Sequence, residues 1–147
     1  MTIRCDLMSQ RQLKLAEDYG LCSVQKGGVT PYNTVSGACG YSSLYISDAG
    51  GGDARFLESA QVSPYWFYGP ILIGSRTVSW TNWSLGTSGS VGGTIPPSGA
   101  LWSTYDYAFT DSGYVTTSMG GWVVVDSPFI GPTLCYFNSP SDSGTIS

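Results

Sequence analysis

Few side chains of this protein could carry out catalysis, and the absence of one residue type, histidine, narrows the reactions that are possible. Hydrolysis requires an acid–base pair or a nucleophile with a base. The 147 residues include no histidine, which excludes a serine triad of the usual kind. A carboxylate pair such as Asp106 and Asp111 could serve a glycosidase. Asp111-Ser112-Gly113 is more simply a turn, however, and Asp106 a solvated strand residue. We therefore expect no enzymatic activity.

Metal chemistry has equally little support. Asp48 and Asp53 flank three consecutive glycines and could offer carboxylate and carbonyl oxygens to calcium. Two acids are fewer than a good calcium site shows, and the segment is better explained as a turn. The four cysteines lack the close pair spacing of a zinc site, and no histidine supplements them. We expect neither a metal nor a cofactor.

The even number of cysteines favours two disulfides over buried free thiols. Four cysteines permit three pairings. We prefer Cys5–Cys22 as a local crosslink and Cys39–Cys135 as a crosslink that joins the ends of the main domain. On the chain-entropy model the longer loop would contribute about 4 to 5 kcal/mol as an upper figure. Disulfides indicate an extracellular protein, although Met1–Leu7 lacks the apolar core of a leader and any leader is absent from this sequence.

Aromatic side chains are the strongest sign of a binding surface. Four of them stand consecutively between Pro64 and Pro70, which confine the segment to an edge strand or a loop. A strand cannot bury four adjacent side chains in one core, so at least two should face solvent or a partner. The alternative is that another part of the monomer covers them. The predicted contact residues for a partner or glycan are Tyr65, Trp66, Phe67, Tyr68 and Trp83.

These residues depend on strands to position them. The stretch 76–86 alternates with period two: Val78 and Asn82 face one way, and Thr77 and Trp83 the other. This pattern predicts a central strand whose hydroxyl-rich outer face could contact a ligand. Further alternating segments, separated by glycine and proline turns, predict an all-β fold, an antiparallel β-sandwich of about eight strands. Charged residues make up 11% and aromatics 14%, a balance typical of extracellular all-β proteins.

The expected organisation has four parts. Residues 1–26 form an N-terminal arm with a possible short helix, because Ser9 and Gln12 fit a capping box, although Leu13-Lys14-Leu15 also alternates as a strand would. Residues 27–38 form a linker or edge segment, and 39–137 form the β-sandwich domain. Residues 138–147 are polar and are predicted to be a flexible tail.

Charge and hydropathy exclude two classes of partner. The formal net charge is −4 and no basic cluster is present, so nucleic acid is not expected. No apolar run is long enough to cross a membrane. Asn82-Trp83-Ser84 matches the N-glycosylation sequon, a short pattern that also occurs by chance.

Three stretches resemble small secreted β-sandwich proteins of actinomycetes: Cys39–Leu44, the glycine turn Gly50–Gly52 and Trp80–Gly86. Trp102-Ser103 in a later strand fits the same group. The chain is similar over about residues 39–125 to the adaptor subunit of streptomycete umbrella toxin particles, which links a lectin subunit to a large spoke protein. The resemblance implies a non-enzymatic adaptor, a component of a toxin complex.

Our leading hypothesis is therefore a protein-binding or adaptor module of a larger extracellular assembly. A carbohydrate-binding module that uses the same aromatics is the first alternative. A phage or virion decoration protein is the second, because it would share this composition without a leader. A pull-down from the native source, run beside a glycan array, would separate the three.

Overall fold

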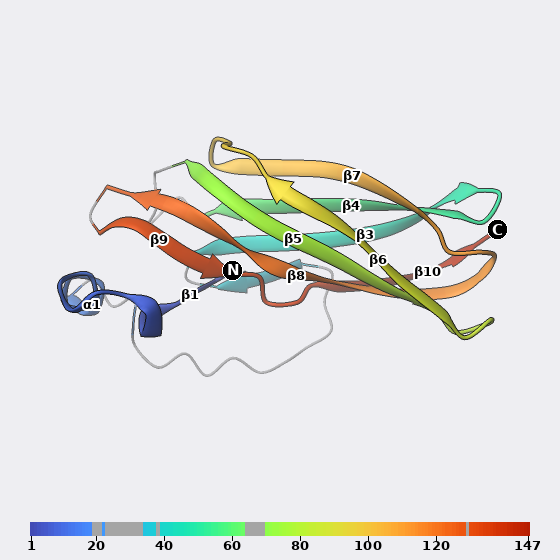
Figure 1. Cartoon of the computed structure of the whole chain (residues 1–147), viewed down its shortest axis with the longest axis horizontal. Helices are drawn as coiled ribbons and strands as arrows, with labels where there is room; N and C mark the ends of the chain where they lie inside the picture. The colour runs from blue at the N-terminus through green and yellow to red at the C-terminus, as the bar shows by residue number, and fades with distance from the viewer. Residues whose placement is uncertain (19–21, 23–33, 38, 64–69, 129) are drawn as a thin grey trace.

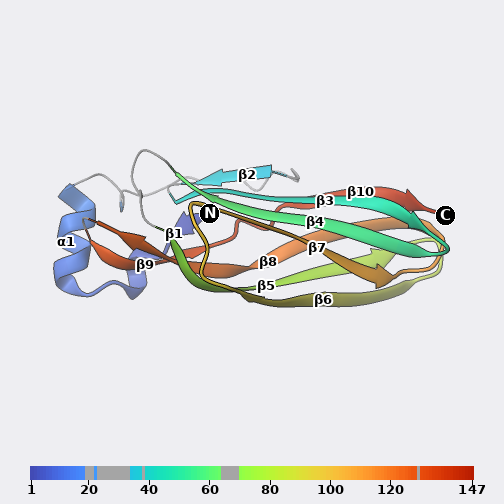
Figure 2. The ribbon, with the colours of Figure 1, turned by 90° about the horizontal axis from the view of Figure 1, so that it is seen from above.

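The computed structural model describes residues 1–18, 22, 34–37, 39–63, 70–128 and 130–147. Two antiparallel sheets pack face to face and form an elongated sandwich (Figures 1 and 2). The predicted all-β sandwich is thus confirmed, with ten strands in the described residues. The core lies between the two sheets and includes Leu44, Phe56, Val78 and Val123.

Sheet A has six strands and sheet B has four. In sheet A the order is β1 (Thr2–Ile3), β9 (Gly131–Tyr136), β8 (Gly113–Ser127), β5 (Ile71–Asn82) and β6 (Thr87–Ile95), and β10 (Ser141–Ile146) also pairs with β8. In sheet B the order is β2 (Thr34–Gly37), β3 (Gly40–Gly50), β4 (Asp53–Val62) and β7 (Leu101–Phe109).

Strand β5 is the predicted central strand, since it pairs with both β6 and β8. Its side chains alternate as the sequence indicates. Val78 and Asn82 are buried between the sheets, whereas Thr77 and Ser79 are exposed on the outer face of sheet A. Period-two patterning therefore identified both the strand and its inner face.

Strand β8 changes partner part of the way along its length. Residues 113–118 pair with β10 and residues 122–127 pair with β9. Gly121 lies between these halves with φ of 143°, and a Cβ there would be 2.1 Å from the Ser75 carbonyl oxygen of β5. The close approach to the backbone of β5 requires glycine at this position.

The predicted flexible tail at 138–147 is wrong. Ser141–Ile146 form β10, which pairs residue by residue with β8 from Ser118 to Gly113. Ile146 is buried in the core. Backbone hydrogen bonds pair the strand whatever its side chains, so its polar composition hid it from sequence analysis.

The N-terminal segment is part of the sandwich and not a separate arm. Strand β1 pairs with β9, and Met1 and Ile3 are buried in the core. After the short 3₁₀ turn Cys5–Leu7, helix α1 spans Gln10–Asp18 at one end of the molecule (Figure 2). The predicted helix is confirmed.

The predicted capping box is also present at the start of α1. The Ser9 amide donates to Gln12 Oε1 at 3.2 Å, and the Gln12 amide donates to Ser9 Oγ at 3.3 Å. The Gln12 side chain also donates to the carbonyl oxygen of Ile130, 3.2 Å away. This contact ties the helix to the chain just before β9.

Both preferred disulfides are present, Cys5–Cys22 and Cys39–Cys135. Cys39 precedes β3 of sheet B and Cys135 lies in β9 of sheet A, so the longer bridge joins the two sheets. Both of its cysteines are fully buried. None of the described helices is long and apolar enough to cross a membrane.

Candidate functional site

The predicted contact residues have different outcomes. Tyr65, Trp66, Phe67 and Tyr68 lie outside the described residues, so their prediction stays open. Trp83 follows β5 and is 66% exposed. Its indole Nε1 donates to Thr116 Oγ1 of β8 at 2.8 Å, which holds the ring in a defined orientation. Trp83 is thus an exposed and oriented aromatic side chain.

A larger group of exposed aromatics lies on the outer face of sheet B, and sequence reasoning missed it. We call it the aromatic face. Its large side chains are between 42% and 61% exposed. They are Tyr41 and Tyr45 on β3, and Leu101, Tyr105, Tyr107 and Phe109 on β7.

Strand register brings the members of the aromatic face into rows. Tyr45, Leu57 and Tyr105 are opposite one another on β3, β4 and β7. In the next row Arg55 of β4 is opposite Tyr107, and its guanidinium lies 5.2 Å from the ring centre of Tyr105. Arg55 Nε also donates to Ser47 Oγ of β3 at 3.1 Å. The cation is therefore fixed among the aromatic rings.

The sequence does contain a signal for this face. Residues 101–109 alternate cleanly between two sets, but the pattern does not say which set points inward. Both sets contain large aromatic residues. Trp102 belongs to the buried set, whereas Tyr105, Tyr107 and Phe109 belong to the exposed set. The inward set also includes Asp106, so hydrophobicity did not identify the inward side.

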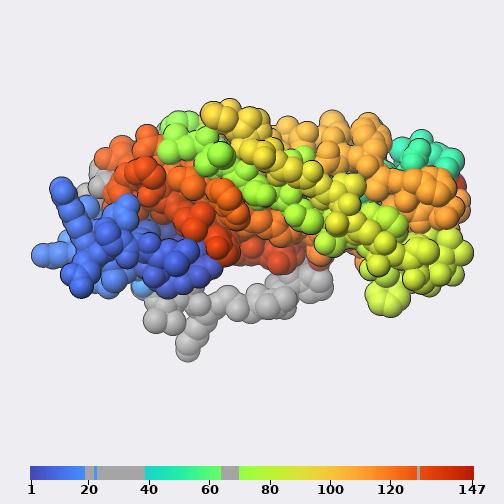
Figure 3. All heavy atoms as spheres, viewed as in Figure 1, coloured from blue at the N-terminus to red at the C-terminus, as the bar shows by residue number. Residues whose placement is uncertain are grey.

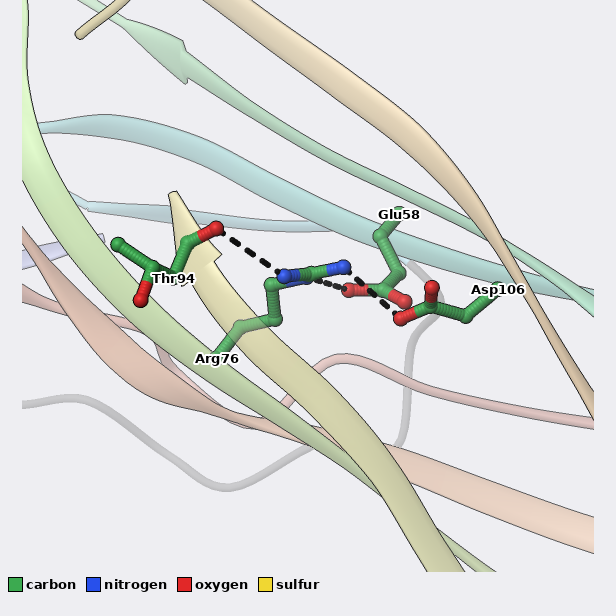
Figure 4. A network of polar contacts seen from close by, with 4 residues as sticks. All are labelled: Glu58, Arg76, Thr94 and Asp106. Atoms are coloured by element: carbon green, nitrogen blue, oxygen red, sulfur yellow. Dashed lines mark hydrogen bonds and ion pairs between the residues drawn. The ribbon is translucent and has the colours of Figure 1, made fainter. Parts of the chain in front are cut away.

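Charged side chains meet inside the sandwich (Figure 4). Arg76 of β5 donates from Nε to Glu58 Oε2 of β4 and from Nη2 to Asp106 Oδ2 of β7, both at 2.8 Å. Its Nη1 donates to the Thr94 carbonyl oxygen of β6 at 3.3 Å. The guanidinium also lies 5.1 Å from the ring centre of Trp102. One arginine thus connects four strands of both sheets.

This cluster corrects the interpretation of Asp106 as a solvated strand residue. Its side chain is 26% exposed and is ion-paired with Arg76, while the Glu58 side chain is fully buried. Burial, and next the neighbouring Asp106 carboxyl, raise the pKa of Glu58 to about 7, against the opposing effect of Arg76. Glu58 Oε1 is buried without a hydrogen-bond partner in the described structure. The arrangement joins the two sheets.

Asn82 has a structural role despite its sequon. It is fully buried, and its Nδ2 donates to the carbonyl oxygens of Thr110, Asp111 and Ser112 at 2.9 to 3.3 Å. Its Oδ1 accepts the amides of Ser84 and Leu85. The amide is therefore not accessible for glycosylation in the folded chain, and it ties the β5–β6 turn to the β7–β8 turn.

Residues 48–53, which were considered as a calcium site, form a turn. Asp48 accepts from the Ser147 hydroxyl and from the Gly50 amide, and these bonds hold its pKa below the usual value. Among the described residues, no group of three or more potential ligand side chains could hold a metal ion.

Comparison with known proteins adds no further information: no family model, curated protein or solved structure matches this chain. Function is therefore inferred from the surfaces described above.

Proposed function

We propose that this protein is a non-enzymatic, protein-binding module of an extracellular assembly, and that the aromatic face of sheet B contacts its partner. The observation that carries the proposal is the set of exposed Tyr, Phe and Leu side chains around Arg55. Tyrosine and arginine are enriched in protein interfaces and among the residues that dominate binding energy.

The geometry suits a protein partner. The rows span three neighbouring strands, so the exposed rings lie together on one side of the sheet. Ordering such side chains on binding costs little entropy because tyrosine has few rotatable bonds. Arg55 is held by Ser47 and Tyr105, so a partner carboxylate or carbonyl would meet a preorganised donor.

The lack of catalytic function is part of the proposal. The candidate acid Asp106 is engaged by Arg76, and Glu58 is closed off from solvent between the sheets. Asp111 is exposed in a turn with positive φ. The two disulfides fit an oxidising environment, which supports an extracellular location. The adaptor role itself rests on the sequence resemblance to the toxin-particle subunit.

The test is capture of partners from the culture medium of the source organism on immobilised protein. The wild type is compared with the double variant Tyr105→Ala/Tyr107→Ala. The control is Ile73→Ala, which removes an exposed apolar side chain from sheet A. We expect the double variant to weaken capture by a factor of about 30, which corresponds to the hot-spot scale of about 2 kcal/mol.

The Ile73→Ala control should capture the partner as the wild type does. Equal capture by all three proteins would contradict the proposal. So would a polysaccharide-hydrolysing activity that disappears in Asp106→Asn/Asp111→Asn, because the protein would then be an enzyme.

A further inference from the structure

The opposite side of the molecule is the outer face of sheet A, which is turned toward the viewer in Figure 3. A hollow of about 270 Å³ lies on this face over β5, β8 and the start of β10. Its lining consists of hydroxyl-bearing residues. They are Ser79, Thr81, Thr116, Thr117, Ser118 and Ser141.

Strand register arranges the outward hydroxyls in two rows. One row runs across the sheet through Ser141, Ser118, Ser79 and Ser90. The second row runs through Ser143, Thr116, Thr81 and Ser88. Neighbours within a row are roughly 4.8 Å apart and the rows roughly 7 Å apart, as strand geometry dictates. The face is thus a regular array of donors and acceptors.

The array carries no charge. The next row along the sheet is Gly120, Thr77 and Gly92, which is also neutral. Asp142 lies between Ser141 and Ser143, but its carboxylate accepts from the Ile46 amide of sheet B at 3.0 Å and so faces the other sheet. Among the described residues of these rows, none could neutralise an anion or a cation.

Trp83 stands beside the hollow. Its Nε1 donates to Thr116 Oγ1, a hydroxyl of the lining, and two-thirds of the tryptophan is exposed. Because Thr116 Oγ1 accepts this bond, its own proton is available to donate elsewhere. An aromatic ring with its NH already satisfied therefore adjoins an uncharged, hydroxyl-lined hollow.

We propose that this hollow binds a neutral saccharide, with a sugar ring stacked on Trp83 and its hydroxyls bonded to Thr116, Thr81 and Ser79. A saccharide has both an apolar ring face and many hydroxyl groups, which matches this pairing of one ring with an array of hydroxyls. A phosphate or metal ion would meet no opposite charge here, and an apolar ligand would leave the hydroxyls unpaired. This site lies on the opposite sheet from the aromatic face and is independent of it.

The test is isothermal titration calorimetry with four neutral oligosaccharides: cellohexaose, xylohexaose, mannohexaose and chitohexaose. We expect at least one to bind the wild type with a dissociation constant in roughly the micromolar to millimolar range. Trp83→Ala and Thr116→Val should each weaken that binding about tenfold or more. Trp83→Phe, which keeps a ring but loses the NH, should weaken it less than Trp83→Ala.

Two controls separate this site from general damage and from the aromatic face. Thr77→Val changes an exposed threonine of β5 outside the hollow, and Tyr107→Ala changes the opposite sheet. Both should bind the sugar as the wild type does, and thermal melting confirms that every variant is folded. The proposal is overturned if none of the four sugars binds the wild type, if folded Trp83→Ala binds normally, or if Tyr107→Ala loses binding equally.

Discussion

Arg76 shows how a single side chain can join two sheets whose facing surfaces are otherwise mostly apolar. Its guanidinium pairs with carboxylates on β4 and β7 and with a backbone carbonyl on β6. On the facing side of β6, Gly93 leaves room for it, since a Cβ there would be 3.0 Å from Nη1. The sequence shows the arginine and the two carboxylates but not their pairing, because Arg76 lies in one sheet and Glu58 and Asp106 lie in the other.

We predict that at pH 8, where Glu58 is ionised, Arg76→Met lowers the free energy of unfolding by about 3 to 5 kcal/mol, because it leaves the buried carboxylate without its cation. The matched control is Arg55→Met, which removes an exposed arginine and should cost within about 0.5 kcal/mol. Urea unfolding measures both. Similar costs for the two variants would show that the buried cluster contributes no more than a surface pair.

The pH dependence of stability tests the state of Glu58. The pKa of this carboxyl is 4.5 in the unfolded chain, and burial raises it to about 7 in the folded chain. Between these values the folded chain holds a proton that the unfolded chain lacks. The stabilising contribution is therefore complete below pH 4.5 and is lost as the pH rises to about 7.

The comparison is wild type against Glu58→Gln, a neutral side chain of similar shape, in urea unfolding from pH 4 to pH 8. The stability of the wild type relative to the variant should fall by up to about 1.4 kcal/mol per pH unit between pH 4.5 and 7, then level off. A relative stability that instead stays level between pH 4.5 and 7 would mean that Glu58 is ionised beside Arg76 throughout that range.

At the scale of elements, side-chain alternation and turn residues were sufficient to predict most strands, and the capping box was sufficient to predict helix α1. They failed for β10, where polar residues on both sides of the strand give no periodic signal. They also left open which side of β7 faces the core, because the buried side contains Asp106 and Trp102. Both failures come from long-range pairing, which local pattern does not encode.

Strand β10 provides a test at this scale. Ile146 is buried, whereas its neighbour Thr145 is exposed. Ile146→Ala should therefore lower the free energy of unfolding by about 2 to 5 kcal/mol, as for other buried aliphatic truncations. Thr145→Ala should change it by no more than about 0.5 kcal/mol. Chemical denaturation that finds no cost for either change would mean that this segment is a flexible tail after all.

At the scale of the whole molecule, the sandwich presents two chemically distinct outer faces. Sheet B exposes aromatic side chains around one arginine, and sheet A exposes uncharged hydroxyls beside Trp83. The Cys39–Cys135 bridge and the Arg76 cluster both cross the interior and hold the sheets together. Two independent faces on a rigid core are what a linking module needs, which fits the proposed role in an assembly.

The most direct measurement is hydroxyl-radical footprinting of the protein, free and bound to the partner that it captures. Tyr45, Tyr105, Tyr107 and Phe109 should become protected from labelling in the complex. Ile73, exposed on the other sheet, should react equally in both states. Unchanged labelling of the four aromatic residues in a saturated complex would contradict the proposed role of the aromatic face, because the partner would then bind elsewhere on the molecule.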